Sequence, residues 1–224
     1  MQTDPEIIQV VKPYTLCSTE RIQNSLNSVE AIVTNGVQGD IIECGVWKGG
    51  MVLAMLLKLK QLGVTDRVVH LYDTFDGMTP PSGVDVDLAG NVAANILESV
   101  ICRAPIDVVR DVVAMAGYPE DRVVFHVGDI LETDVKKSVP CRIALLRMDL
   151  DWYNLTCFLI AQFIPRVQFN GIVIVDDYGH WQGCRKAIDE YVTSLPPSQR
   201  PQIQQIDYTG VWWTNKRFPT ALMR

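Results

Sequence analysis

Short apolar runs that end in acidic residues recur along this chain, and two of them have the same form. Residues 143–151 read I-A-L-L-R-M-D-L-D, and residues 171–177 read G-I-V-I-V-D-D. Runs of this kind are typical of strands that are buried on both faces of a parallel sheet. Ligands of open α/β sheets bind outside the carboxyl ends of the strands. If the two strands are neighbours, that edge gathers four carboxylates: Asp149, Asp151, Asp176 and Asp177.

Four carboxylates at such short range would repel one another, and a bound divalent cation is the usual remedy. Magnesium is a divalent cation that prefers carboxylate and water oxygens. The pattern therefore predicts a metal-assisted site at the ends of these two strands.

The rest of the chain alternates further predicted strands with helices. Apolar residues at helical spacing predict helices over 19–34, 51–62, 153–167 and from about 184 to 195. Five more strands are predicted near 41–42, 67–73, 122–127, 203–206 and 211–214. This order predicts an α/β fold whose last two strands form a hairpin. We expect one domain over 1–224, with an N-terminal arm and helix at 1–36 and a lid-like insertion at 76–120.

The insertion interrupts the alternation of strands and helices. It opens near D-G-M-T-P-P-S-G, carries the acids Asp85 and Asp87, and then becomes helical. An insertion beside a ligand crevice is often a lid. A plain pair of connecting helices is the alternative that the sequence leaves open.

A glycine-bearing turn joins the first predicted strand to a helix. Residues 43–49 read E-C-G-V-W-K-G, which differs from the G-x-G-x-x-G of dinucleotide-binding folds. Glycine lacks Cβ and lets a ligand approach the backbone, although a tight turn without a ligand fits the same residues. Asp73, at the tip of the next strand, is well placed to hold ribose hydroxyls. Asp129 follows the third strand, where it could meet an adenine amino group or only form a turn.

Composition and charge limit the kinds of binding partner and the cellular location that we expect for this protein. The 224 residues carry a formal net charge of −6 and no long basic run, so neither nucleic acid nor an anionic membrane is expected as a partner. No CxxC pair is present, and Cys44, Cys141 and Cys157 lie in or beside apolar runs, which predicts buried free thiols. The N-terminus lacks the features of a signal peptide, and no apolar run reaches membrane-spanning length. We therefore expect a cytoplasmic protein.

Four stretches together resemble the macrocin O-methyltransferase (TylF/MycF) family. They read G-D-I-I-E-C-G-V-W-K-G-G, Y-D-T-F-D-G-M, A-L-L-R-M-D-L-D-W-Y and V-I-V-D-D-Y-G-H-W-Q-G-C-R-K-A-I-D-E-Y. The resemblance runs from about Pro13 to Lys216. It implies a class I methyltransferase fold, with a Rossmann-like, mostly parallel sheet of seven strands, an antiparallel last strand and helices on both faces. It also implies S-adenosylmethionine and Mg²⁺ as cofactors, a homo-oligomer, and a small-molecule acceptor such as a deoxysugar or another vicinal diol on a natural product.

The resemblance also implies a role for each candidate residue. Glu43 and Gly45 would lie against the methionine part of the cofactor, Asp73 would hold the ribose, and Asp129 would approach the adenine. Asp149, Asp176 and Asp177 would ligate Mg²⁺. Asp151 would be the general base, and His180 and Trp181 would lie beside the acceptor. Asp151 could instead cap the helix at 153–167, and His180 could be a base or a structural histidine in a turn.

Two other metal-dependent enzyme classes are alternatives. Asp149-Leu150-Asp151 fits the D-x-D by which many glycosyltransferases hold a nucleotide-sugar, but that function explains neither residues 43–49 nor the pair Asp176-Asp177. A catechol-type O-methyltransferase shares the expected fold and metal. It would normally place a lysine base where this chain has Asp151.

Overall fold

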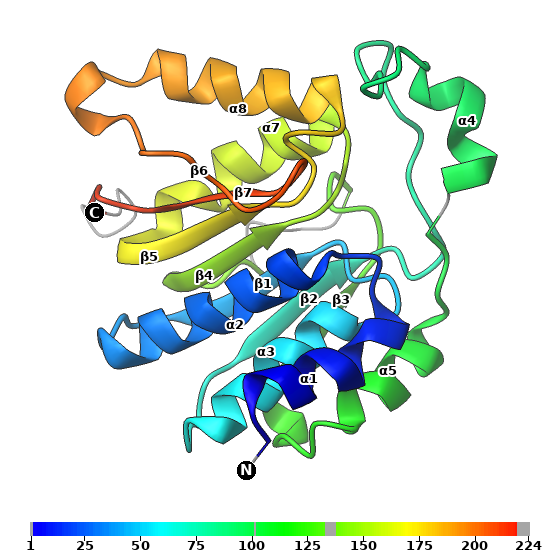
Figure 1. The fold of residues 1–224 in the computed structure, drawn as a ribbon. Coiled ribbons are helices and arrows are strands. Elements are labelled where there is room, and N and C mark those ends of the chain that lie inside the picture. Colours follow the sequence, from blue (N-terminus) through cyan, green and yellow to red (C-terminus); the bar gives the residue numbers. More distant parts are fainter. Residues whose placement is uncertain (1, 101, 133–137, 219–224) are drawn as a thin grey trace.

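A computed structural model describes residues 2–100, 102–132 and 138–218 of the chain. Its centre is one seven-stranded sheet (Figure 1), in the order β3-β2-β1-β4-β5-β7-β6. The strands are β1 (Asp40–Cys44), β2 (Val69–Asp73), β3 (Val123–Val127), β4 (Ile143–Met148), β5 (Val167–Val175), β6 (Gln204–Gln205) and β7 (Val211–Thr214). The first five strands run parallel, and β7 is antiparallel to both β5 and β6. The predicted seven strands, their mostly parallel arrangement and the antiparallel last strand are confirmed.

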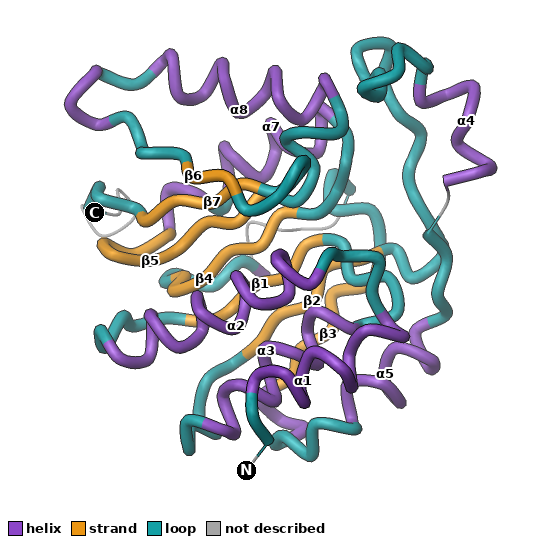
Figure 2. The backbone as a smooth tube through the Cα atoms, viewed as in Figure 1, coloured by secondary structure: helices purple, strands orange, loops and turns teal. Residues whose placement is uncertain are grey.

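Helices cover both faces of the sheet (Figure 2). Within the described residues the α-helices are α1 (Asp4–Val11), α2 (Thr19–Thr34), α3 (Gly50–Gln61), α4 (Ala93–Val100), α5 (Ile106–Ala114), α7 (Tyr153–Gln162) and α8 (Gln182–Ser194). Residues of α1, α2, α3 and α5 pack into one hydrophobic core, and those of α7 and α8 pack into a second. Strand β1 contributes Ile41 to the first core and Ile42 to the second, which is the two-sided burial expected of a central parallel strand.

The helix predicted over 153–167 is shorter than expected, because α7 ends at Gln162. A 3₁₀ turn, Ile164–Arg166, follows it, and β5 already begins at Val167. Pro165 lies in that turn, and proline lacks the N–H that would continue a helix. The arm at the N-terminus also contains a helix that was not predicted, α1. A capping box between Thr3 and Glu6 stabilises its first turn.

The insertion holds α4 and α5, so the predicted helical content is confirmed. Helix α4 lies at the side of the molecule, at the upper right of Figure 1. Helix α5 packs against α3, and its Val109 is fully buried in the core. Ala93, the first residue of α4, is fully buried in the second core, so both halves of the insertion are anchored in the body of the protein.

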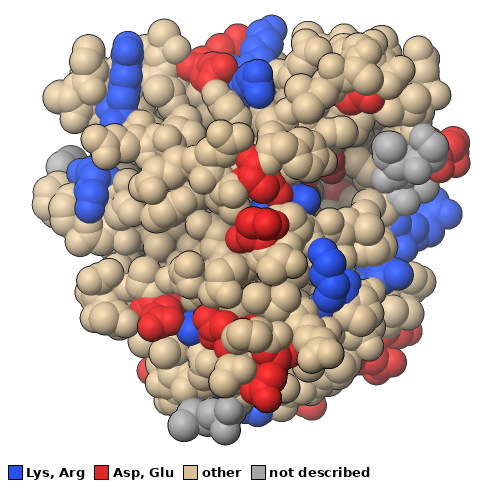
Figure 3. Space-filling model, viewed as in Figure 1, with Lys and Arg blue, Asp and Glu red and all other residues tan. Residues whose placement is uncertain are grey.

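All six cysteines are free thiols, as predicted. Cys44 is buried, but the expectation of burial is wrong for Cys141, which is exposed because it lies in the loop before β4 rather than in the strand. No helix in the described part of the chain is long and apolar enough to cross a membrane. On the face viewed in Figure 3, lysines and arginines are dispersed among neutral and acidic side chains rather than gathered into one patch.

Candidate active site

The two acid-bearing strands are neighbours, as the sequence predicted. Strands β4 and β5 pair in parallel with Met148 opposite Val175, so the aspartates that follow leave the sheet side by side. The amide of Asp149 donates to the carbonyl of Cys44 at 2.8 Å, and the amide of Asp176 donates to the carbonyl of Met148 at 2.9 Å. These bonds extend the ladder by one residue and fix the backbone from which both carboxylates project.

The carboxylates form two overlapping groups. One oxygen from each of Asp149, Asp151 and Asp177 lies within 4.8 Å of the others, and so does one ligand atom from each of Cys17, Asp149 and Asp176. Burial raises the pKa of Asp149, Asp151 and Asp177, and the charges of neighbouring carboxylates raise these values further. These carboxylates repel one another when all are ionised, and a bound divalent cation would relieve the repulsion. Carboxylate oxygens are the ligands that a hard cation such as Mg²⁺ prefers.

Arg147 is one of two arginines that form ion pairs with this cluster. It is the next-to-last residue of β4, and its side chain is fully buried. It forms ion pairs with Glu43 and Asp176, and a third with Asp149 at 2.7 Å. Sequence reasoning missed this residue, although a charged side chain inside an apolar strand is itself a signal, because burial of an unpaired charge is costly.

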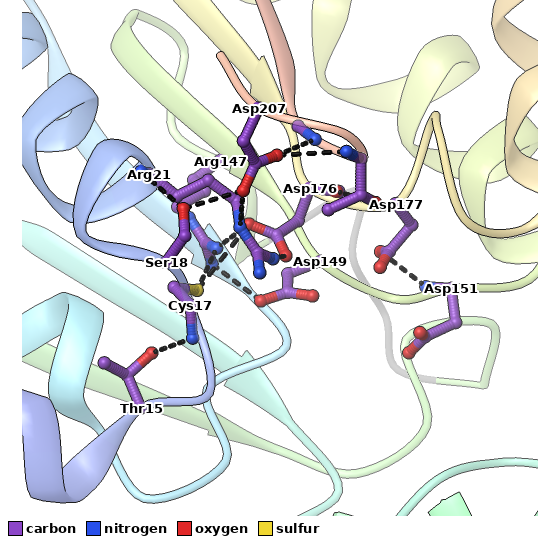
Figure 4. A network of polar contacts seen from close by, with 12 residues as sticks. Thr15, Cys17, Ser18, Arg21, Arg147, Asp149, Asp151, Asp176, Asp177 and Asp207 are labelled. Atoms are coloured by element: carbon purple, nitrogen blue, oxygen red, sulfur yellow. Dashed lines mark hydrogen bonds and ion pairs between the residues drawn. The ribbon is translucent and has the colours of Figure 1, made fainter.

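A second arginine reaches the same cluster from α2. Arg21 pairs with Asp176 and, at 2.9 Å, with Asp207 in the loop between β6 and β7. Asp176 therefore receives a guanidinium on each of its two oxygens, as Figure 4 shows. The hydroxyl of Ser18 also donates to Asp207, at 2.7 Å. The start of α2 and the β6–β7 loop thus close one side of the cluster.

Cys17 belongs to this closed side. Its Sγ lies 3.0 Å from a guanidinium nitrogen of Arg147 and 3.7 Å from Asp176. Burial raises the pKa of the Cys17 thiol far above its usual value, with the charge of Asp176 acting in the same direction. The side chain is therefore a neutral packing and hydrogen-bonding group at this position. Neither Cys17 nor Arg21 was singled out from the sequence.

The turn after β1 packs against the backbone of Asp149. Gly45 has a φ of +86°, and a Cβ there would lie 1.7 Å from the carbonyl oxygen of Asp149. The close packing of the β1 turn on Asp149 is thus a sufficient reason for glycine, whatever ligand binds. Burial raises the pKa of Glu43 to about 8. Its Oε2 is buried, and no hydrogen bond from the described residues reaches it.

Asp73 and Asp129 both make local backbone contacts. The carboxylate of Asp73 accepts hydrogen bonds from the amides of Val46, at 2.6 Å, and Trp47, at 3.0 Å, and so holds the turn after β1. The carboxylate of Asp129 accepts from the amide of Leu131 at 2.9 Å, which is the turn-forming role that the sequence left open. The other oxygen of Asp73 accepts from the amide of Phe75 at 2.8 Å and from the hydroxyl of Thr74 at 3.4 Å, so this carboxylate is held by four donors.

Asp151 has an unusual backbone conformation, with a φ of +61°. Non-glycine residues rarely adopt this left-handed region, and such strain is concentrated at functional sites. Its Oδ1 accepts a hydrogen bond from Trp181 Nε1 at 2.7 Å, and its amide donates to Asp177 at 3.1 Å. Asp151 does not cap α7, because the residue at the N-cap is Trp152 and the first helical amide, of Tyr153, donates to Asp85.

His180 lies between two aromatic side chains at the edge of the site. Its ring centroid is 4.9 Å from that of Trp181 and 6.3 Å from that of Tyr208. Whether this histidine takes part in catalysis stays a prediction.

One cavity brings the predicted residues together. It is lined by all nine of the candidates: Glu43, Gly45, Asp73, Asp129, Asp149, Asp151, Asp176, Asp177 and His180. Residues from the ends of all five parallel strands therefore share a single space at the carboxyl edge of the sheet, which Arg21 of α2 also lines.

Comparison with known proteins decides the family. The model of the macrocin-O-methyltransferase (TylF) family matches residues 10–215, which is nearly the whole chain. The chain belongs to this family. It is accordingly an O-methyltransferase, and the alternative of a metal-dependent glycosyltransferase is wrong.

Individual family relatives give the same assignment. The chain is 32% identical over 200 residues to the 8-demethyl-8-(2,3-dimethoxy-alpha-L-rhamnosyl)-tetracenomycin-C 4'-O-methyltransferase of Streptomyces olivaceus, covering 89% of this chain and 75% of that protein. It is 32% identical over 204 residues to the mycinamicin III 3''-O-methyltransferase of Micromonospora griseorubida, covering 89% and 78%. The solved structure of the O-methyltransferase NovP superposes with a TM-score of 0.78 at 29% identity, covering 91% of this chain and 83% of that one. The class I methyltransferase fold predicted from the sequence is confirmed.

Proposed function

We propose that this methyltransferase transfers the methyl group of S-adenosylmethionine to a sugar hydroxyl on a natural product, with the help of Mg²⁺. The observation that carries the proposal is the single cavity. It places the acids expected to hold the cofactor next to the carboxylate cluster expected to hold the metal. The methyl group of the cofactor and the metal must both come close to the acceptor hydroxyl, so the two binding sites need such a shared space.

The cofactor would lie over the ends of β1, β2 and β3. Glu43 offers a buried oxygen that lacks a hydrogen-bond donor among the described residues, which suits the ammonium group of a methionine moiety. Asp73 and Asp129 line the cavity at the next two strand ends, in reach of a ribose and a base. When bound, S-adenosylmethionine supplies an electrophilic methyl group, so the chain has only to position it and to prepare the nucleophile.

The metal would be held by Asp149, Asp176 and Asp177. Asp149 is shared by both carboxylate groups, which makes it the central ligand. The arginines on Asp176 do not exclude it, because Oδ2 accepts from Arg21 alone among the described residues and so keeps a lone pair for a metal. A divalent cation at this place would make a neighbouring hydroxyl easier to deprotonate.

Asp151 is the residue that we assign as the base. One of its carboxylate oxygens lies within 4.8 Å of an oxygen of Asp149 and of an oxygen of Asp177. Burial, together with the charge of Asp149, raises the pKa of Asp151. A raised pKa makes a carboxylate a better proton acceptor near neutral pH. His180 lines the same cavity but is turned toward aromatic neighbours, so we rank it second.

The mouth of the cavity supports a neutral acceptor with an apolar part. Leu16 and Tyr208, which both line it, are 70% and 63% exposed. Among the described lining residues the formal cation is Arg21, already paired with two aspartates, whereas the carboxylates number seven: Glu43, Asp73, Asp129, Asp149, Asp151, Asp176 and Asp177. An acidic acceptor would be repelled, and a sugar on an apolar scaffold would not. A homo-oligomer and a cytoplasmic location stay predictions.

A thermal melt with S-adenosylhomocysteine and Mg²⁺ tests this proposal. At about 100 times its dissociation constant, a ligand stabilises a protein by about 2.7 kcal/mol. For a domain of this size that corresponds to an increase in Tm of roughly 5–10 °C. We expect this increase with the cofactor product, and a further increase with Mg²⁺ that EDTA removes.

The matched variants are Asp149→Asn and Asp121→Asn. Asp149→Asn should lose the increase caused by Mg²⁺ and keep most of that caused by S-adenosylhomocysteine. Asp121 is the control, because its side chain is 76% exposed and it lies in the turn before β3. Asp121→Asn should behave as wild type. A wild-type protein whose Tm does not respond to S-adenosylhomocysteine would refute the proposed cofactor.

A further inference from the structure

Asp85, in the insertion, is a completely buried carboxylate that the chemistry above does not use. The amide and the hydroxyl of Ser82 both donate to its Oδ2 at 2.6 Å. The amide of Tyr153 donates to its Oδ1 at 2.8 Å. No ion pair within the described ranges reaches it, so neutral donors carry the stabilisation of this charge.

Two helix N-termini converge on Asp85. Tyr153 is the first residue of α7, and its amide is one of the groups that a helix cannot satisfy internally. Gly183 is the second residue of α8, and a Cβ at that glycine would lie 1.9 Å from Asp85 Oδ1. The carboxylate therefore occupies the positive ends of both helix dipoles, where an anion is favoured.

Each helix starts just after a residue of the proposed base site, Asp151 for α7 and Trp181 for α8. Asp151 lies two residues before Tyr153, and Trp181, which donates to Asp151, lies directly before α8. Two further bonds join the same places to the insertion. Trp152 Nε1 donates to the carbonyl of Thr79 at 2.8 Å, and the amide of Gln182 donates to the carbonyl of Val86 at 2.8 Å.

The left-handed conformation of Asp151 needs such support. A backbone position of this kind persists only where its surroundings determine it. The residues that follow Asp151 are held by the insertion, and the tryptophan that orients its carboxylate precedes a helix that the insertion also contacts.

We propose that Asp85 is a positioning residue that locks Asp151 and Trp181 in their active arrangement by joining the N-termini of α7 and α8. The insertion then assembles the catalytic base as well as bordering the cavity. This inference rests on the proposed function, because it takes Asp151 as the base.

The test compares Asp85→Asn with Asp87→Asn. Asp87 is a matched control, because it lies two residues away in the same loop and accepts hydrogen bonds from Ala89 and Asn91 within that loop. We expect Asp85→Asn to lower kcat by about 30-fold or more, with the KM for S-adenosylmethionine within about twofold of wild type. Asp87→Asn should keep kcat within about threefold.

A second readout does not depend on activity. Trp152 and Trp181 are buried with their ring centroids 4.9 Å apart, so near-ultraviolet circular dichroism reports their arrangement. Asp85→Asn should change that spectrum while S-adenosylhomocysteine still raises the Tm, and Asp87→Asn should leave the spectrum unchanged. Gly183→Ala, which pushes on Oδ1 without removing the charge, should reproduce both effects of Asp85→Asn.

Several outcomes would overturn the inference. One is an Asp85→Asn variant with kcat within threefold of wild type and an unchanged spectrum. Another is a loss of kcat that Asp87→Asn shares. If Asp85→Asn does not fold, Ser82→Ala removes one donor from the same carboxylate, and a kcat equal to wild type in that variant would count against the inference. If wild-type protein does not bind S-adenosylhomocysteine, the proposed function fails, while the spectral comparison still tests the positioning of the tryptophans.

Discussion

Replacing Asp151 with asparagine is expected to lower kcat by about 10²- to 10⁴-fold, the range that general acid–base groups contribute. Asparagine keeps the size of the side chain and can accept the hydrogen bond from Trp181, but it cannot take a proton from a sugar hydroxyl. The backbone strain also remains tolerable, because asparagine adopts positive φ more readily than most residues. The loss should therefore be chemical and not structural, and single-turnover rates of methyl transfer would measure it.

The control for this prediction separates proton transfer from metal binding. Asp151→Asn should retain the Tm increase caused by Mg²⁺, whereas Asp149→Asn should lose it. His180→Gln should reduce kcat far less than Asp151→Asn, since the ring contacts aromatic neighbours. If His180→Gln is the variant that abolishes turnover and Asp151→Asn retains kcat within tenfold, the assignment of the base is wrong.

Replacing Arg147 with methionine is expected to destabilise the protein by about 3–5 kcal/mol, the usual cost of removing one partner from a buried ion pair. Methionine fills a similar volume, but it leaves Glu43 and one side of Asp176 without their cation in a buried position. Urea unfolding should show a lower midpoint with an unchanged slope. Arg103→Met is the matched control, because its side chain is 61% exposed and its pair with Asp76 is exposed too, so its effect should stay within about 0.5 kcal/mol.

A second variant tests the cause of that destabilisation. Glu43→Gln combined with Arg147→Met removes one of the stranded charges and should recover part of the loss. Equal stability of Arg147→Met and wild type would show that the guanidinium is not needed to hold the carboxylates together.

The sheet and the acid cluster could be predicted because their signals are local. Each parallel strand is a short apolar run, and the aspartates that follow two such runs must meet if the strands pair, as β4 and β5 do. The spacing of apolar residues continues through Pro165 into β5, so it predicts a helix up to residue 167, whereas α7 ends at Gln162, before the proline.

The contacts that complete the site could not be read from the pattern. Asp85 and Tyr153 are 68 residues apart, and nothing in the sequence of the insertion specifies which helix its acid will meet. The same holds for Arg21 and Cys17, which reach Asp176 across more than 150 residues. Arg147 differs from these residues, because it lies within the apolar run of the predicted strand itself. A charged side chain buried there has to be paired with acids, so its role could have been predicted.

The most direct test of the account is methyl transfer under metal control. Purified protein would be incubated with S-adenosylmethionine and a panel of neutral deoxysugar glycosides, and S-adenosylhomocysteine release would be recorded before and after EDTA treatment and after Mg²⁺ is restored. We predict acceptor-dependent release that EDTA lowers by at least about 10²-fold and that Mg²⁺ restores in wild type but not in Asp149→Asn. Turnover of the same acceptors that is unchanged by EDTA and by Asp149→Asn would contradict the claim that the carboxylates at the ends of β4 and β5 form a catalytic metal site.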